Sequence, residues 1–164
     1  MKKRKKTAAI STHAGNQEYI ANTYVMRCFT VTMIVYLIAF LLNQVDIFII
    51  EKRLMWSAFV PSVIIYAIGQ LTARKMSLAD KRTKYFILCC TITLFTITGV
   101  FLTYHAILLL ALPFLYATLY SSKRVMRYVF VLTVISTIVT VYCGYFFGLC
   151  DANMVLLTSK DISD

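Results

Sequence analysis

Charged side chains are absent from four long stretches of this 164-residue chain, and acidic side chains are scarce throughout. Seven Asp and Glu residues stand against 17 Lys and Arg residues, and the charged fraction is 15%, whereas roughly 25% is usual for a soluble domain. The hydrophobic fraction is 60% and the mean hydropathy is +0.74. These values exclude an ordinary soluble domain and indicate a membrane protein.

The chain also lacks the short motifs of the common enzyme classes. It contains no H-E-x-x-H, no G-x-S-x-G, no phosphate-binding P-loop and no C-x-x-C. No Asp, Glu, Lys or Arg falls near the middle of an expected span, and ion-coupled transporters usually bury such a group because transport depends on it. We therefore expect a chain that is not an enzyme, with no catalytic residues, no cofactor and no metal site.

What the chain does contain is apolar sequence long enough to cross a bilayer several times. A crossing helix needs about 20 apolar residues, and the charge-free runs are 28–45, 54–73, 85–122 and 128–150. The third run would be roughly 57 Å long as a helix, nearly two membrane thicknesses, so it must fold back near 102–106. The sequence thus predicts an all-α membrane bundle at 28–150 with five spans, near 28–45, 55–72, 85–103, 106–121 and 128–149.

The basic residues predict how this bundle is oriented. All but three of the 17 Lys and Arg residues fall in the N-terminal tail or in the loops after spans two and four; the exceptions are Lys52, Arg53 and Lys160. Because short cytoplasmic loops carry the excess of Lys and Arg, we expect a cytoplasmic tail at 1–27 and an extracytoplasmic tail at 151–164. The net charge of +10 then reflects topology and contact with lipid head groups, and no nucleic-acid partner is expected.

The last span carries a stripe of small residues. Every fourth position is small from Ser136 through Thr140 and Gly144 to Gly148. Small side chains on one face let another helix approach closely, which is how helices associate in lipid. The stripe predicts a helix-packing surface. Its partner is either the Thr-rich span 85–103 of the same chain or a second copy in a homodimer, and the spacing leaves both open.

Two further groups of residues are candidates for function. Tyr104, His105, Asp151 and Asn153 are polar residues expected near the outer surface, where they form either a sensing pocket or ordinary solvated loops. Pro61 and Pro113 fall inside the second and fourth predicted spans, and each is expected to bend its helix because proline removes a backbone donor.

Part of the sequence resembles a known family. The features are Tyr104 and His105 before a Leu-rich helix with Pro113, "LYATLYSSKR" at 115–124, "LTVIS" at 132–136 and "GLCDANM" at 148–154. Together, residues 104–158 resemble the N-terminal membrane sensor region of clostridial-type GGDEF diguanylate cyclases and sensor histidine kinases. The resemblance implies a further helix and a cytoplasmic output domain, yet only "SKDISD" follows Thr158, with no GG[DE]EF motif. We expect either part of a longer receptor or a small membrane protein that acts alone.

These observations lead to one functional prediction and its rivals. We expect the input module of a bacterial signalling protein in the inner membrane, with the lipid bilayer as its surroundings and a ligand that the sequence does not identify. The alternative is a small oligomeric transporter or transporter subunit. A lipid-modifying enzyme would need clustered acidic or His residues, which the sequence does not show.

Overall fold

The computed structural model describes residues 2–47, 50–102 and 108–147. These residues form helices and turns, with no strand among them. The elements are α1 (Lys2–Gln44), α2 (Lys52–Met76), α3 (Thr83–Leu102), α4 (Leu112–Thr118) and α5 (Lys123–Phe147). The prediction of an all-α bundle is confirmed.

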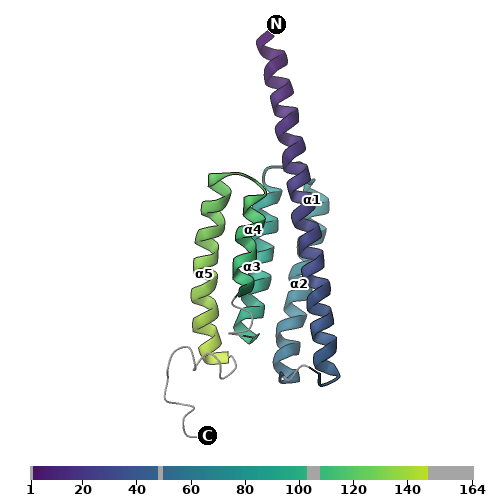
Figure 1. Cartoon of the computed structure of the whole chain (residues 1–164), viewed down its shortest axis with the longest axis vertical. Coiled ribbons are helices and arrows are strands. Elements are labelled where there is room, and N and C mark those ends of the chain that lie inside the picture. The colour runs from purple at the N-terminus through teal and green to yellow at the C-terminus, as the bar shows by residue number, and fades with distance from the viewer. Residues whose placement is uncertain (1, 48–49, 103–107, 148–164) are drawn as a thin grey trace.

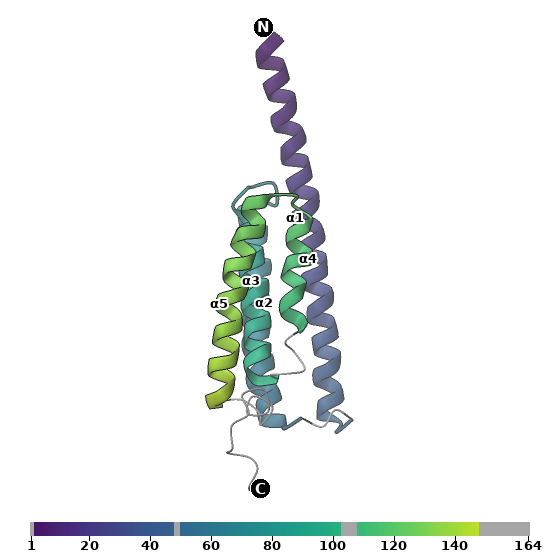
Figure 2. The same ribbon diagram turned by 60° about the vertical axis from the view of Figure 1, so that its left-hand side comes forward.

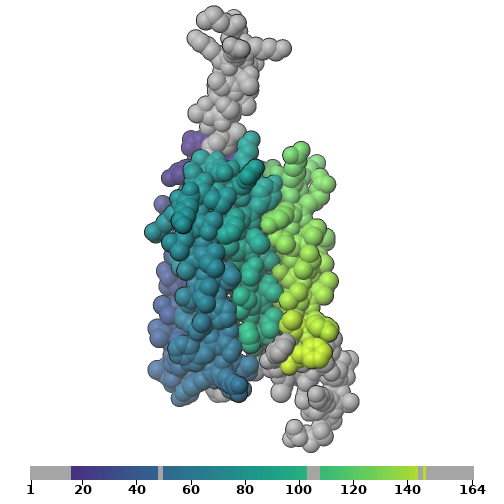
Figure 3. All heavy atoms as spheres, turned by 180° about the vertical axis from the view of Figure 1, so that it is seen from behind, coloured from purple at the N-terminus to yellow at the C-terminus, as the bar shows by residue number. Residues whose placement is uncertain are grey.

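The helices alternate in direction along one bundle axis. Going along the chain, α1, α3 and α5 run one way while α2 and α4 run back (Figures 1 and 2). The central helix is α3, which packs against each of the other four, and most of its side chains are buried. Seen from behind, α2 and α5 lie on either side of α3 (Figure 3). The core therefore follows the length of α3.

Within the described ranges, four helical segments are long and apolar enough to cross a membrane: Asn16–Gln44, Lys52–Met76, Thr83–Leu102 and Lys123–Cys143. The predicted fourth span at 106–121 is different in kind. There the apolar helix runs only from Leu108 to Thr118, which is roughly 17 Å at 1.5 Å per residue and about half of a hydrocarbon core. The described part of the predicted fourth span is therefore a helix of about half the crossing length (Figure 2).

Pro113 explains part of that difference. We expected it to bend the middle of a span, but it lies in the first turn of α4, directly after a 3-10 turn at 108–111. At this position a backbone N–H has no partner within the helix, so proline starts a helix without breaking one. Pro61 does lie inside a helix, and α2 continues through it from Lys52 to Met76.

The first helix is much longer than the predicted span at 28–45. It is a single helix of 43 residues, Lys2–Gln44, and its N-terminal part projects beyond the other helices (Figure 1). The sequence of α1 contains no proline and one glycine, Gly15, so nothing in the polar segment forces the helix to stop. The polar tail and the first span are thus parts of one rod.

The cationic residues gather at the end of the bundle from which α1 projects. The turns before α3 and before α5 both lie at this end (Figure 1). We call it the basic end, and it carries Arg74, Lys75, Lys81, Arg82, Lys84, Lys123, Arg124 and Arg127. At the opposite end Lys52 forms an exposed ion pair with Asp46, at 2.9 Å. The fold therefore brings together the basic residues that the sequence separates.

This asymmetry leads to a topology test. Cysteine placed at Ser122, at the basic end, should be protected from a membrane-impermeant thiol reagent in intact cells, whereas cysteine placed at Glu51, at the opposite end, should react, because short basic loops stay in the cytoplasm. Both variants would be made in a chain whose five native cysteines are replaced by alanine. Permeabilised cells provide the control, since both positions should then react. Labelling of Ser122→Cys before permeabilisation would contradict the orientation.

Candidate functional site

The small-residue stripe of α5 faces α3 of the same chain. Ser136 and Thr140 are both buried, and a hydrogen bond of 2.8 Å joins the hydroxyls of Thr96 and Ser136. Thr140 lies against Gly99, where a Cβ atom would approach the Thr140 Cγ2 atom to 2.9 Å. Gly144 belongs to α5, and Gly148 lies outside the described residues. The part of the stripe seen here thus forms an interface within the bundle.

The contact at Gly99 predicts a specific sensitivity. Gly99→Leu should lower the free energy of unfolding by about 1–3 kcal/mol, because the new side chain must displace α5 from a close-packed interface. Thermal unfolding of the purified protein in detergent is a direct measurement. Val100→Leu, next to it on α3 but only half-buried, serves as the control and should change stability little. Equal melting temperatures for the wild type and Gly99→Leu would show that α5 does not pack here.

The four residues predicted for outer-face sensing cannot be placed. Tyr104, His105, Asp151 and Asn153 all lie outside the described ranges. Two other features of the bundle, neither of them predicted from the sequence, are the candidate sites that the structure does describe. One is an apolar cavity in the half of the bundle away from the basic end, and the other is a network of polar contacts at the basic end.

The apolar cavity lies beside the segment that leads into α4. It has a volume of about 400 Å³ and lies among α1, the first turns of α2, the last turns of α3 and the segment that leads into α4. Every charged residue type is absent from its wall. The side chains that shape it include Val35, Tyr36, Ala39, Met55, Phe95 and Leu109.

Energetics indicate that such a cavity does not stay empty. The cavity is partly open at the surface of the bundle, so it is filled by whatever molecule lies against that surface. Water is a poor filler, because an ordered water needs two to four polar partners. The cavity is therefore suited to hydrocarbon.

The cavity wall does contain a few hydroxyl groups. Tyr36 is only 8% exposed, and its hydroxyl is buried with no hydrogen-bond partner in the described part of the chain. Ser62 and Thr98 donate to the carbonyls of Ala58 and Leu94 in their own helices. On the same wall the hydroxyl of Thr32 lies 3.3 Å from that of Tyr116. These groups are uncharged and mostly satisfied locally, so the wall remains apolar in character.

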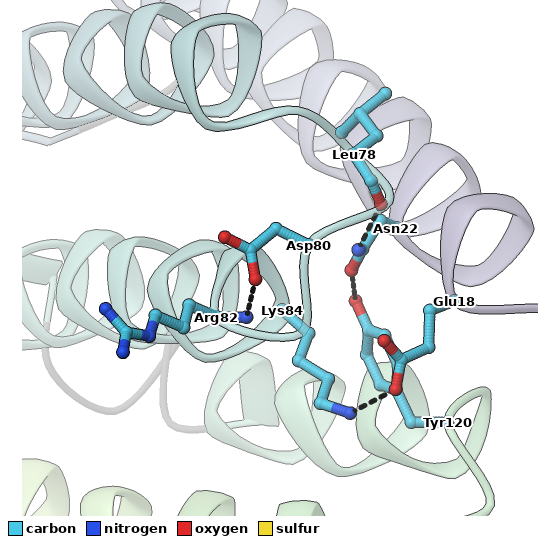
Figure 4. A network of polar contacts seen from close by, with 7 residues as sticks. All are labelled: Glu18, Asn22, Leu78, Asp80, Arg82, Lys84 and Tyr120. Carbon is cyan, nitrogen blue, oxygen red and sulfur yellow. Dashed lines mark hydrogen bonds and ion pairs between the residues drawn. The ribbon is translucent and has the colours of Figure 1, made fainter. Parts of the chain in front are cut away.

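The polar network at the basic end joins four segments. The Lys84 ammonium forms an ion pair with the Glu18 carboxylate at 2.8 Å, with side-chain exposures of 10% and 20%. One turn along α1, the fully buried Asn22 donates from its Nδ2 to the carbonyl oxygen of Leu78 at 2.7 Å. Its Oδ1 accepts a hydrogen bond of 2.7 Å from the Tyr120 hydroxyl. Figure 4 shows these residues converging on α1; we call them the polar joint.

Tyr120 is the part of the polar joint contributed by the turn between α4 and α5. Its ring lies 5.9 Å from the Lys84 nitrogen, within the range of a cation–π interaction. Burial raises the pKa of the Tyr120 hydroxyl well above its usual value, and the nearby Glu18 carboxylate raises it further. Tyr120 therefore stays protonated and keeps donating to Asn22 throughout the physiological pH range.

The ion pair predicts a large effect of a single substitution. Lys84→Met should destabilise the protein by about 3–5 kcal/mol, because it leaves the mostly buried Glu18 carboxylate without its partner. The double variant Glu18→Leu with Lys84→Met should recover most of that loss. The control is Lys52→Met, which breaks the exposed pair with Asp46 and should cost less than about 1 kcal/mol. Similar melting temperatures for Lys84→Met and Lys52→Met would argue against a buried pair.

Besides the cavity hydroxyls and the polar joint, a further set of hydrogen-bonded side chains lies between α1 and α2. Gln70 donates to the hydroxyl oxygens of Thr30, at 3.0 Å, and Tyr66, at 3.1 Å. Thr30 in turn donates to the carbonyl of Met26. The three side chains are all half-buried. They form an uncharged hydrogen-bonded cluster inside the spanning part of the bundle.

The described residues carry no obvious centre for metal or redox chemistry. Among them, no three His, Cys, Asp or Glu side chains lie close enough together to hold a metal ion. Within the same ranges, Cys28, Cys89, Cys90 and Cys143 are free thiols. Comparisons of this chain with protein families, with curated proteins and with solved structures found no match. The cavity and the polar joint are therefore the two features of the described bundle to which a function can be assigned.

Proposed function

We propose that this chain is a membrane input module, in which occupancy of the apolar cavity changes the position of α1 and so passes a signal to the basic end. The observation that carries the proposal is the continuity of α1. The same unbroken helix contributes Val35 and Ala39 to the cavity, contributes Glu18 and Asn22 to the polar joint, and projects beyond the bundle toward Lys2. No other helix in the described part of the chain belongs to all three.

A helix of this kind can transmit a displacement. On α1, Asn22 of the polar joint and Val31 of the cavity wall are nine residues apart, or roughly 14 Å at 1.5 Å per residue. Helix shifts of 1–2 Å are common in switching proteins, because packed interfaces hold a small number of discrete arrangements. We propose that the filled and the empty cavity favour two such arrangements of α1 against α3.

The resemblance of residues 104–158 to the sensor region of GGDEF cyclases and sensor kinases supports the same role. We propose an input module of a bacterial signalling protein in the inner membrane, not itself catalytic, with its basic end in the cytoplasm. The projecting part of α1, rich in Lys and Arg, would then lie near anionic head groups and any output partner.

The alternative, a small transporter or transporter subunit working as an oligomer, is favoured by one observation. The cluster of Thr30, Tyr66 and Gln70 places hydrogen-bonding groups within the spanning part of the bundle, closer to the basic end than the cavity is. A transport path needs such groups. Flux of a substrate into proteoliposomes that is lost with Gln70→Leu would favour the transporter over the input module.

The proposed coupling can be measured by electron paramagnetic resonance. Nitroxide labels at Ser11 in α1 and Ser122 before α5 report on the position of α1, again without native cysteines. Ala39→Trp, which fills the cavity from α1, should shift the label-to-label distance by about 1–5 Å in lipid nanodiscs.

The matched control is Leu41→Trp, which adds the same ring to a lipid-facing position two residues further along α1. It should leave the distance distribution unchanged. If Ala39→Trp and the wild type gave the same distribution while both folded, α1 would not respond to the cavity and the input-module proposal would fall.

A further inference from the structure

The apolar cavity has the properties of a lipid-chain site. Its wall combines Val35 and Ala39 from α1, Met55 from α2, Phe95 from α3 and Leu109 from the segment before α4. Residues from four parts of the chain therefore surround one volume of about 400 Å³, which is within the range of ordinary ligand pockets. A lipid-facing helix surface, by contrast, presents side chains from one or two neighbouring helices.

The depth of the cavity defines what can enter it. It extends from Ile50 and Leu102, at the helix ends opposite the basic end, to Thr32 and Leu112 inside the spanning part. The surrounding helices are apolar enough to lie in a bilayer, so the molecules available at this depth are lipids. A charged group would meet no partner on the wall, and desolvating it there is strongly unfavourable.

We propose that the cavity binds one hydrocarbon chain of a membrane lipid, taken from the leaflet opposite the basic end. The head group stays in the interface beside Ile50, and the chain runs along α1 past Ala39 and Tyr36 toward Thr32. This inference names the ligand class of the input module and, in its signalling consequence, rests on that proposed function. The module would then respond to the chain length and the unsaturation of the surrounding lipid.

Chain selectivity follows from the limited length of the cavity. The space ends near Thr32 and Leu112, where the Thr32 and Tyr116 hydroxyls meet and α4 begins. A longer or rigid chain has to displace these groups, whereas a shorter chain leaves part of the void unfilled. Both outcomes are unfavourable in a close-packed interior.

Photocrosslinking tests the site directly. The full-length protein would be placed in nanodiscs that contain a phosphatidylcholine with a diazirine near the end of one acyl chain. Peptide mass spectrometry should find the label concentrated on cavity residues such as Val35, Ala39 and Leu109. Ala39→Trp should lower that cavity labelling at least tenfold, and Leu41→Trp should leave it unchanged. Leu109→Phe provides a second, milder block in case the tryptophan variant does not fold.

The outcomes separate the two proposals. Cavity labelling that is blocked by Ala39→Trp, without any movement of the spin labels, would establish the lipid site and refute the input module. Labelling spread evenly over exposed positions such as Leu41 would overturn the lipid site. Cavity labelling that neither blocking variant lowers would also overturn it. An absence of cavity labels, as expected if another part of this chain or a second copy covers the opening, would overturn it as well.

Discussion

The constraint on which this structure depends is that polar groups inside a bilayer must find their partners within the protein. The central helix meets it locally. In α3, Thr91, Thr93, Thr96 and Thr98 each donate a hydrogen bond to the carbonyl four residues earlier. A Thr-rich helix can therefore lie at the centre of the bundle with its hydroxyl hydrogens satisfied, while its small side chains let neighbouring helices approach closely.

The same constraint sorts charge by depth. The mostly buried ion pair of Glu18 and Lys84 lies at the basic end, beside the turns that precede α3 and α5 (Figure 4). The spanning part instead uses neutral hydrogen bonds, as between Gln70 and Thr30 or between Thr96 and Ser136. Buried charge is thus confined to the place where its desolvation costs least.

The sequence predicted the features that depend on composition and spacing. Charge-free runs located the spanning helices, and the small residues at Ser136 and Thr140 indicated a packing face. The ends of the helices were harder to predict. Glycine usually marks the positive-φ positions beside helix ends, but here those positions are occupied by Asp46, Ser77 and Ser121. The prediction that Pro113 bends the middle of a span was wrong, because proline is found in the first turn of a helix as well as at bends.

The candidate sites themselves could not have been read from the sequence. The polar joint combines residues 56 to 98 positions apart, such as Asn22 with Leu78 and Asn22 with Tyr120. Among these residues, Glu18 alone has a sequence context that could have indicated a buried partner, because it is an isolated acidic residue shortly before a predicted span. The cavity combines residues of α1, α3 and the segment before α4, and a run of apolar residues at 85–122 carries no sign of which of its positions will face one another.

The two ends of the bundle are held together to different degrees, and this difference bears on how α1 could move. At the basic end, an ion pair and two hydrogen bonds of 2.7 Å fix α1 to the loop before α3, to α3 itself and to the turn before α5. At the opposite end, the exposed pair of Lys52 and Asp46 contributes little, but Asn43 donates a hydrogen bond of 2.7 Å to the carbonyl of Ile50, and Phe40 packs against Trp56 and Phe59 of α2. These contacts hold α1 to α2, whereas on its side toward α3 it borders the cavity. A displacement that starts at the cavity would therefore move α1 relative to α3 and would pivot at the polar joint. The projecting N-terminal part of α1, on the far side of that pivot, would then move in the opposite direction.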